Sequence, residues 1–252
     1  MGLDIYAGTL TRYYSRNWLT SVQQWGIDNG FEVNIVRPNG QENTASPEEI
    51  YEGVTGWRDN IIKGLGAELS APPLWNEDYN ITPYYTDKPD WDAVDALMLF
   101  VAAKRLGKEV PPTVEKNFDV WEHPICKEYM SNKTEQTSLF DGGGWWVPIK
   151  EPFLFNYVLP TGHESPIATA GLLKLELEYI NSLEWNADRE TIIGWRDSEG
   201  YPTDATYRGG KIDHIAKHEE FDTVSLAKFA FSILWQAAEF SLEHGTVIIY
   251  DF

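Results

Sequence analysis

Residues 222–252, DTVSLAKFAFSILWQAAEFSLEHGTVIIYDF, predict one long, almost wholly buried helix followed directly by a β-strand. Apolar side chains recur at helical spacing and cover most of the circumference of this helix, so other elements must enclose it. Asp222 or Thr223 can cap its first turn, and Gly245 follows its last turn. The β-branched run after Gly245 suits a buried strand. We therefore expect this helix to be central in the fold.

The rest of the chain predicts four further helices and several short strands. Ser15 and Asp90 are expected to cap helices, and Ser46-Pro47-Glu48-Glu49 forms a capping box with proline in the first turn. Ser165-Pro166 resembles another helix start, whereas residues 111–144 are expected to be irregular and residues 186–221 to form turns and short strands. The predicted helices are residues 15–27, 46–64, 91–106 and 172–183, and the predicted strands are residues 3–10, 31–38, 145–149 and 153–159.

These elements indicate an α+β or α/β fold, with a mixed β-sheet packed by about five helices. Strand, helix and strand within residues 3–38 are compatible with a βαβ unit. Pro148 and Pro152 favour edge positions for the two neighbouring strands. The tetrapeptide Gly-Trp-Arg-Asp occurs at 56–59, in a predicted helix, and at 194–197, among turn residues, which indicates coincidence. No linker divides the chain, so we expect residues 1–252 to form a single globular domain.

The composition is strongly acidic and rich in tryptophan. The 39 acidic and 20 basic side chains give a formal net charge of −19, which disfavours nucleic-acid binding and would attract a basic protein partner. The alternative is that the acidity only maintains solubility. The 11 tryptophans fit a tryptophan-rich core, or some of them line a ligand groove.

Cys126 is the single cysteine, so neither an intramolecular disulfide nor a cysteine-based zinc site is expected. The opening Met-Gly-Leu-Asp-Ile-Tyr lacks the features of a secretory signal, and no apolar run is long enough to span a membrane. We therefore expect a cytoplasmic protein that has no contact with a membrane.

Residues 8–16, Gly-Thr-Leu-Thr-Arg-Tyr-Tyr-Ser-Arg, are the best candidate for a ligand site. They would join the carboxyl end of the first strand to the first helix, where α/β proteins often bind anions. Guanidinium and hydroxyl groups could hold a small anionic ligand, or both arginines could pair with acids elsewhere. No phosphate-binding or dinucleotide fingerprint is present. The candidate ligand-binding residues are Arg12, Tyr13, Tyr14, Ser15 and Arg16.

A second candidate is the pair His214 and His218, which would share one face of a helix and could hold a metal ion weakly. Ile215 stands where a zinc peptidase motif needs glutamate, so that chemistry is excluded. Residues 162–165, Gly-His-Glu-Ser, fit a turn better than a catalytic triad, because adjacent residues cannot approach a substrate from separate directions. No catalytic residue, cofactor or committed metal site is predicted.

Two segments, MGLDIYAGTLTRYY at 1–14 and YTDKPDWD at 85–92, resemble an uncharacterised family of bacterial proteins of similar length. The resemblance implies a bacterial cytosolic origin and implies no activity. Two functions therefore stay open. The first is an interaction module that docks a basic protein, similar in character to toxin-immunity proteins. The second is a small-molecule enzyme or sensor with an anionic ligand at Arg12 and Arg16.

Overall fold

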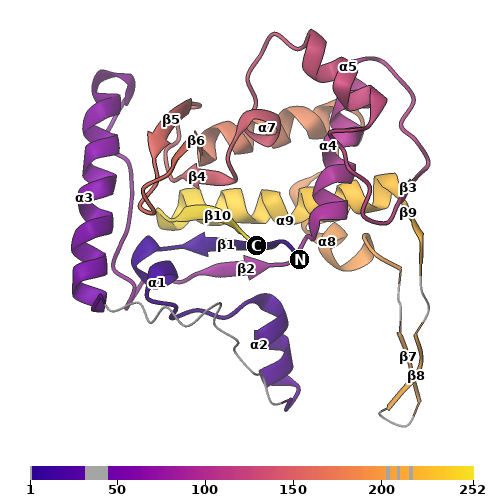
Figure 1. Ribbon diagram of the computed structural model, residues 1–252, viewed down its shortest axis with the longest axis horizontal. Helices are drawn as coiled ribbons and strands as arrows, with labels where there is room; N and C mark the ends of the chain where they lie inside the picture. Colours follow the sequence, from indigo (N-terminus) through magenta and orange to yellow (C-terminus); the bar gives the residue numbers. More distant parts are fainter. Residues whose placement is uncertain (1, 32–44, 203–204, 209–210, 216–217) are drawn as a thin grey trace. The chain divides into compact units, whose positions relative to one another are not determined.

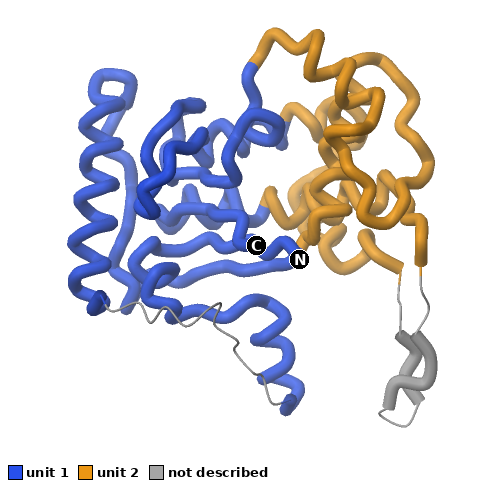
Figure 2. Tube along the Cα trace, viewed as in Figure 1, with its two compact units in different colours: residues 1–88, 136–178, 236–252 blue, residues 89–135, 179–235 orange. Residues whose placement is uncertain are grey.

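The computed structural model describes residues 2–31, 45–202, 205–208, 211–215 and 218–252. Within these residues the chain has an α+β fold with a mixed six-stranded sheet, as the sequence predicts, and nine α-helices where about five were expected. The chain divides into two compact units, coloured blue and orange in Figure 2. Unit 1 contains residues 1–88, 136–178 and 236–252, and unit 2 contains residues 89–135 and 179–235.

Unit 1 is built on the six-stranded sheet, whose strand order is β2-β1-β10-β4-β6-β5 (Figure 1). The β4–β6 pair is parallel, and the other neighbours are antiparallel. The strands are β1 (Asp4–Gly8), β2 (Tyr85–Asp87), β4 (Trp145–Val147), β5 (Leu154–Val158), β6 (Glu164–Thr169) and β10 (Val247–Asp251).

The predicted final strand, β10, lies inside this sheet between β1 and β4. Tyr6, Ile249 and Trp145 lie in register across these three strands and belong to one hydrophobic cluster. Their neighbours Ile5 and Ile248 are also buried, because both faces of the sheet are covered. The almost continuous apolar run of β10 follows from this double burial.

Helix α3 (Pro47–Leu65) contributes to the same hydrophobic cluster and confirms the predicted capping box. The Ser46 hydroxyl accepts from the Glu49 backbone N–H, and the Glu49 carboxylate accepts from the Ser46 N–H. The α3 side chains Ile50, Val54 and Ile61 are buried in this cluster together with residues of the sheet. The helix ends at Gly66, whose φ of 46° suits glycine, rather than at the expected Gly64.

The first predicted helix begins later than expected, and Ser15 does not cap it. Ser15 instead follows the short helix α1 (Leu10–Tyr14), which Thr9 caps. The next helix, α2 (Ser21–Asp28), begins at Thr20 through a capping box, and its Val22 and Trp25 are exposed rather than buried. Unit 1 also contains a 3-10 turn η1 (Gly66–Glu68) and helix α6 (Ser138–Asp141).

Helices α7 (Ala170–Leu183) and α9 (Thr223–His244) each contribute residues to both units and confirm two predicted helices. Asp222 caps α9 by accepting from the Ser225 N–H at 2.7 Å. Gly245 ends α9 with a φ of 66°, and the N–H groups of Gly245 and Thr246 both donate to the Ser241 carbonyl. Between residues 223 and 244 Glu243 is the one exposed residue, so α9 is enclosed as its sequence predicts.

Unit 2 is mostly helical and has an aromatic core. Helix α4 is buried along most of its length. The Trp185 ring stacks on Phe100 at 4.6 Å between ring centroids, and it meets Trp195 and Phe231 edge to face at 5.0 Å each. The elements of unit 2 are α4 (Trp91–Arg105), β3 (Thr113–Glu115), α5 (Pro124–Asn132), α8 (Arg189–Ser198), β7 (Ala205–Arg208), β8 (Lys211–Ile215) and β9 (Glu220–Asp222).

Several local predictions were wrong. Ser165-Pro166 begins no helix, because both residues lie in β6. Strand β4 is internal, since it ends at Val147, before Pro148 could interrupt its pairing. Helix α5 occupies a segment expected to be irregular, and α8, with the second Gly-Trp-Arg-Asp copy, replaces expected turns and short strands. The short strands β7, β8 and β9 confirm the rest of the prediction for residues 186–221.

Two further predictions concern segment ends. Asp90 precedes α4, but its side chain makes no capping hydrogen bond and its φ is 58°. The predicted strand at 31–38, and with it the βαβ unit, lies almost entirely outside the described residues.

Among the helices that the structure describes, none combines the length and the apolar character needed to cross a bilayer. The single-domain organisation stays a prediction, since α7 and α9 run through the division into units.

Candidate functional site

The predicted anion site lies where β1 passes into α1. Thr9 caps α1, and its hydroxyl accepts from the Arg12 backbone N–H at 3.2 Å. Thr11, in the first turn, is wholly buried. The helix is only five residues long, so the main chain offers one turn of N–H groups at this position.

Arg12 is used within the protein. Its Nη2 donates to the carbonyls of Tyr79 and Thr82, the latter at 3.0 Å. Its guanidinium carbon lies 4.9 Å from the centre of the Tyr84 ring. Arg12 therefore fastens the loop at residues 79–84 to α1, and its partners are carbonyls and a ring rather than the acids that we considered.

The other four predicted residues have separate partners or positions. The Tyr13 hydroxyl donates to Asp251 at 2.6 Å. Burial is the main cause that raises the Tyr13 pKa, and the Asp251 carboxylate is the second. The Ser15 hydroxyl donates to the Arg12 carbonyl at 3.1 Å. Arg16 is exposed, has a φ of 57° and lies over the Tyr13 ring at 5.7 Å. Tyr14 lines a separate groove on α3.

Glu77 is a residue that the sequence analysis missed. Its side chain is 2% exposed, and its carboxylate accepts from both the N–H and the hydroxyl of Thr11, each at 3.0 Å. Trp75 Nε1 donates to the other oxygen at 3.2 Å. Burial raises the Glu77 pKa to about 7, although these hydrogen bonds and the nearby Arg58 oppose the shift. A carboxylate of the protein itself thus occupies the donors at the start of α1.

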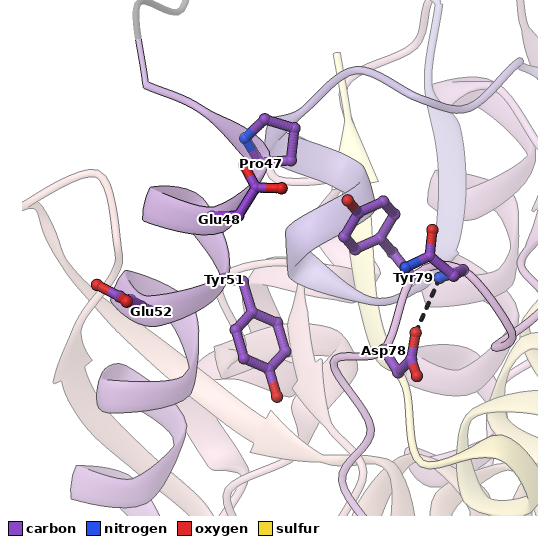
Figure 3. A pocket seen from close by; sticks show the side chains of 7 residues that line it. Pro47, Glu48, Tyr51, Glu52, Asp78 and Tyr79 are labelled. Carbon is purple, nitrogen blue, oxygen red and sulfur yellow. Dashed lines mark hydrogen bonds between the residues drawn. The ribbon is translucent and has the colours of Figure 1, made fainter.

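The loop anchored by Glu77 and Arg12 forms one wall of a surface hollow beside α3. This acidic hollow has a volume of about 460 Å³. Figure 3 shows that side chains of α3 form one side and Asp78 and Tyr79 of the loop form the other. Asp78 accepts from the Asn80 N–H at 3.1 Å. The acidic hollow is lined by Pro47, Glu48, Tyr51, Glu52, Asp78, Tyr79 and Asn80.

Three acidic residues and two tyrosines therefore line the acidic hollow, and none of the described residues that line it is positively charged. Glu48, Glu52 and Asp78 are all exposed to solvent. Tyr51 is 42% exposed and offers an aromatic surface beside them. The arrangement suits a cationic side chain, because carboxylates attract its charge while aromatic faces attract it through their quadrupoles.

A second depression lies on α3 next to the end of β5. This groove has a volume of about 820 Å³ and shares Glu52 with the acidic hollow. Trp57 Nε1 donates to the Val158 carbonyl at 2.7 Å and so ties α3 to the strand. The groove is lined by Tyr14, Ile50, Glu52, Gly53, Val54, Gly56, Trp57, Asn60, Tyr157, Val158, Leu159 and Pro160.

The predicted histidine pair does not lie on a helix. His214 belongs to strand β8, and His218 follows that strand, so the expected helical spacing of the two residues was wrong. The described residues contain no cluster of three or more histidine, cysteine, aspartate or glutamate side chains that could hold a metal ion. Cys126 is buried, and burial raises the pKa of its thiol to about 12, which does not favour a reactive thiolate.

Unit 2 has its own perturbed carboxyl group. Burial, with a smaller contribution from the nearby carboxylates Asp119 and Asp92, raises the pKa of Asp95 to about 7. A backbone hydrogen bond from Val120 acts in the opposite direction. Paired carboxylates can serve in acid–base chemistry, but no pocket described for the chain is lined by Asp95.

Comparisons of this chain with protein-family models, with curated proteins and with solved structures found no match. Within unit 1, the acidic hollow and the groove both lie on α3 and share Glu52.

Proposed function

We propose that the protein is an interaction module that docks a basic protein partner through the acidic hollow on α3. The observation that carries the proposal is that Glu48, Glu52 and Asp78 line one hollow together with two tyrosines and with no basic residue among the described lining. A lysine or arginine of the partner would enter this hollow. Its charge would be balanced by the carboxylates and its stem would pack on the tyrosine rings.

The overall charge supports the same partner chemistry. A net charge of −19 creates a field that accelerates the approach of a basic protein and repels nucleic acid. In this respect the protein is similar in character to immunity proteins, which neutralise basic toxins by masking their surfaces. We place this interaction in the bacterial cytoplasm and without a cofactor, a catalytic step or a membrane.

The alternative, an enzyme or sensor that binds a small anionic ligand at the β1–α1 turn, has one observation in its favour. The Arg16 side chain is exposed, and it lies near the Tyr13 ring and the Tyr14 hydroxyl rather than in an ion pair with a described acid. Arg12 and the α1 N-terminus, however, already hold protein carbonyls and the Glu77 carboxylate. We therefore rank this alternative below the docking of a basic partner.

The test compares two triple variants that change the net charge equally. One removes the hollow carboxylates (Glu48→Gln, Glu52→Gln, Asp78→Asn), and the control removes three other exposed carboxylates of unit 1 (Glu68→Gln, Glu164→Gln, Glu178→Gln). The probe is a synthetic nonapeptide of alternating basic residues and valine, titrated by calorimetry at several salt concentrations. We expect the hollow variant to bind about tenfold more weakly than the control. Equal weakening in both variants would mean unspecific attraction and would overturn the proposal.

A further inference from the structure

Strand β5 lies at one edge of the sheet and, in the described part of the chain, pairs with β6 alone. The backbone groups of its odd-numbered residues face β6: the Phe153 carbonyl accepts from Thr169, and the Leu159 N–H donates to His163. Opposite Asn156 stands Pro166, whose carbonyl faces away from β5 and accepts from Gly143. Because the direction of these groups alternates along a strand, Leu154, Asn156 and Val158 direct theirs to the free edge.

One outward group shows where this edge faces. The Val158 carbonyl accepts from Trp57 Nε1 of α3, so the free edge of β5 faces the groove. No other hydrogen bond to the outward groups of Leu154, Asn156 and Val158 occurs among the described residues. Asn156 is exposed, and Val158 is 49% exposed. The edge carries no charged residue that would block pairing with another chain.

The opposite side of the groove leaves room for a strand. At Gly53 and Gly56, both on α3, no atom lies within 4 Å of the position that a Cβ would take. The remaining contribution of α3 to the groove is largely apolar, through Ile50, Val54 and Trp57. Glu52 is the one charged side chain among the described lining residues, so the groove favours a segment that combines apolar and basic residues.

We propose that an extended segment of the basic partner adds to β5 as a further strand, lying in the groove between β5 and α3. The inference rests on the proposed function for the charge of the partner. Main-chain hydrogen bonds to the N–H and carbonyl of Asn156 and to the Val158 N–H would supply affinity, since the Val158 carbonyl already accepts from Trp57. Alternate side chains would supply specificity. One set would be apolar and pack over Gly53 and Gly56, and the other would be basic and lie near Glu52. A second copy of this chain is disfavoured as occupant, because both copies would carry a charge of −19.

The decisive probe is the nonapeptide of alternating basic residues and valine in three forms: unmodified, N-methylated at every valine, and N-methylated at every basic residue. In an added strand, N–H groups of one parity face β5 and those of the other parity face away. We expect one methylated form to lose at least about tenfold in affinity and the other to stay within about twofold. Amide hydrogen exchange at Asn156 and Val158 should slow in the complex.

The outcomes separate this inference from the proposed function. Equal binding of both methylated forms, with unchanged exchange at β5, would overturn strand addition and leave the acidic hollow as the docking site. Absence of salt-sensitive binding by the unmodified peptide would overturn both. Dimerisation of the free protein that protects Asn156 would identify a second copy as the occupant and would likewise overturn the inference.

A matched pair of glycine variants tests the groove itself. Gly56→Leu places a side chain in the groove, whereas Gly64→Leu adds the same side chain to the same helix outside the groove. Both sites are open, so both variants should fold and be at least as stable as the wild type. We expect Gly56→Leu to weaken peptide binding at least about tenfold and Gly64→Leu to leave it unchanged. Equal binding by the two variants would contradict occupancy of the groove.

Discussion

The two depressions on α3 share Glu52 but have walls of different construction. The far wall of the acidic hollow is a loop fastened by polar groups, namely the Glu77 carboxylate and the Arg12 guanidinium. The far wall of the groove is strand β5, fastened by its ladder to β6 and by the Trp57 indole. A wall held by a buried ionisable group responds to pH, whereas a wall held by neutral hydrogen bonds does not. The two sites should therefore respond differently to the same perturbation.

The largest expected effect is the pH dependence that Glu77 gives to the free energy of unfolding. Its pKa is raised from 4.5 to about 7, so the folded protein binds the proton more tightly than the unfolded chain. The contribution of Glu77 to the free energy of unfolding is therefore fully present below pH 4.5 and is lost as pH rises through 7. The difference between the two pKa values corresponds to about 3 kcal/mol. Urea unfolding between pH 4 and about 8.5 measures this loss.

The control for that experiment is Glu77→Gln, which cannot titrate and should lack this part of the pH dependence. Asp95→Asn should remove a separate part with the same sign, because the pKa of Asp95 is also raised to about 7. Identical pH profiles for the wild type and Glu77→Gln would show that Glu77 does not titrate near neutral pH, and the contrast between the two walls would fail.

Arg12→Gln should have the next largest effect. It removes the charged donor to the carbonyls of Tyr79 and Thr82, at an expected cost of about 2 kcal/mol in unfolding free energy. Amide exchange should accelerate at residues 78–82 and stay unchanged at 154–158. Arg16→Gln is the matched control: the Arg16 side chain is exposed, so it should change stability by less than about 0.5 kcal/mol. Equal acceleration at both walls would contradict their independence.

Trp57→Phe should affect the groove and spare the hollow. The phenyl ring retains much of the packing on Trp75 and Tyr157, but the hydrogen bond to the Val158 carbonyl is lost. We expect a loss of about 1 kcal/mol in unfolding free energy. Exchange should accelerate near Val158, with residues 78–82 as the internal control. Faster exchange confined to residues 78–82 would show that Trp57 fastens the wall of the acidic hollow rather than β5.

The smallest expected effect is a gain in stability. Gly53→Ala adds a methyl group where no neighbour lies within 4 Å, so it should stabilise α3 by about 1 kcal/mol without closing the groove. Gly66→Ala is the contrasting variant, because the φ of 46° at Gly66 strains any residue with a Cβ. Thermal unfolding of both variants should shift in opposite directions, and a loss of stability in Gly53→Ala would mean that the site is less open than described.

The elements that the sequence predicts correctly carry local signals. Helix α3 has its capping box at Ser46, and α9 has Asp222 at one end and Gly245 at the other. Pro166 led to a wrong helix prediction because its place in the sheet cannot be read from the local sequence. It occupies a position in β6 that donates no hydrogen bond to β5, and the pairing with β4 that the structure gives begins at Ala168. Proline therefore costs this strand little, although it is typical of a helix start.

The candidate site could be predicted only in part, because it depends on contacts between distant segments. Arg12 is correctly singled out as an unusual cation, but its partners at Tyr79 and Thr82 come from a loop with no periodicity. Glu77 lies 66 residues from Thr11 in the chain, and nothing in its local sequence distinguishes it from the other acids. The acidity of the chain indicates a basic partner, whereas the hollow at Glu48, Glu52 and Asp78 emerges only from the fold.

The place of β10 in the sheet has a consequence for biosynthesis. Five of the six strands leave the ribosome before β10, yet β10 pairs with β1 on one side and with β4 on the other. Until its residues 247–251 emerge, the nascent chain exposes the inner edges of β1 and β4, including Trp145 and Trp146. The sheet can therefore be completed only after residues 247–251 have emerged, and the chain before that point is a natural substrate for chaperones that shield apolar strand edges.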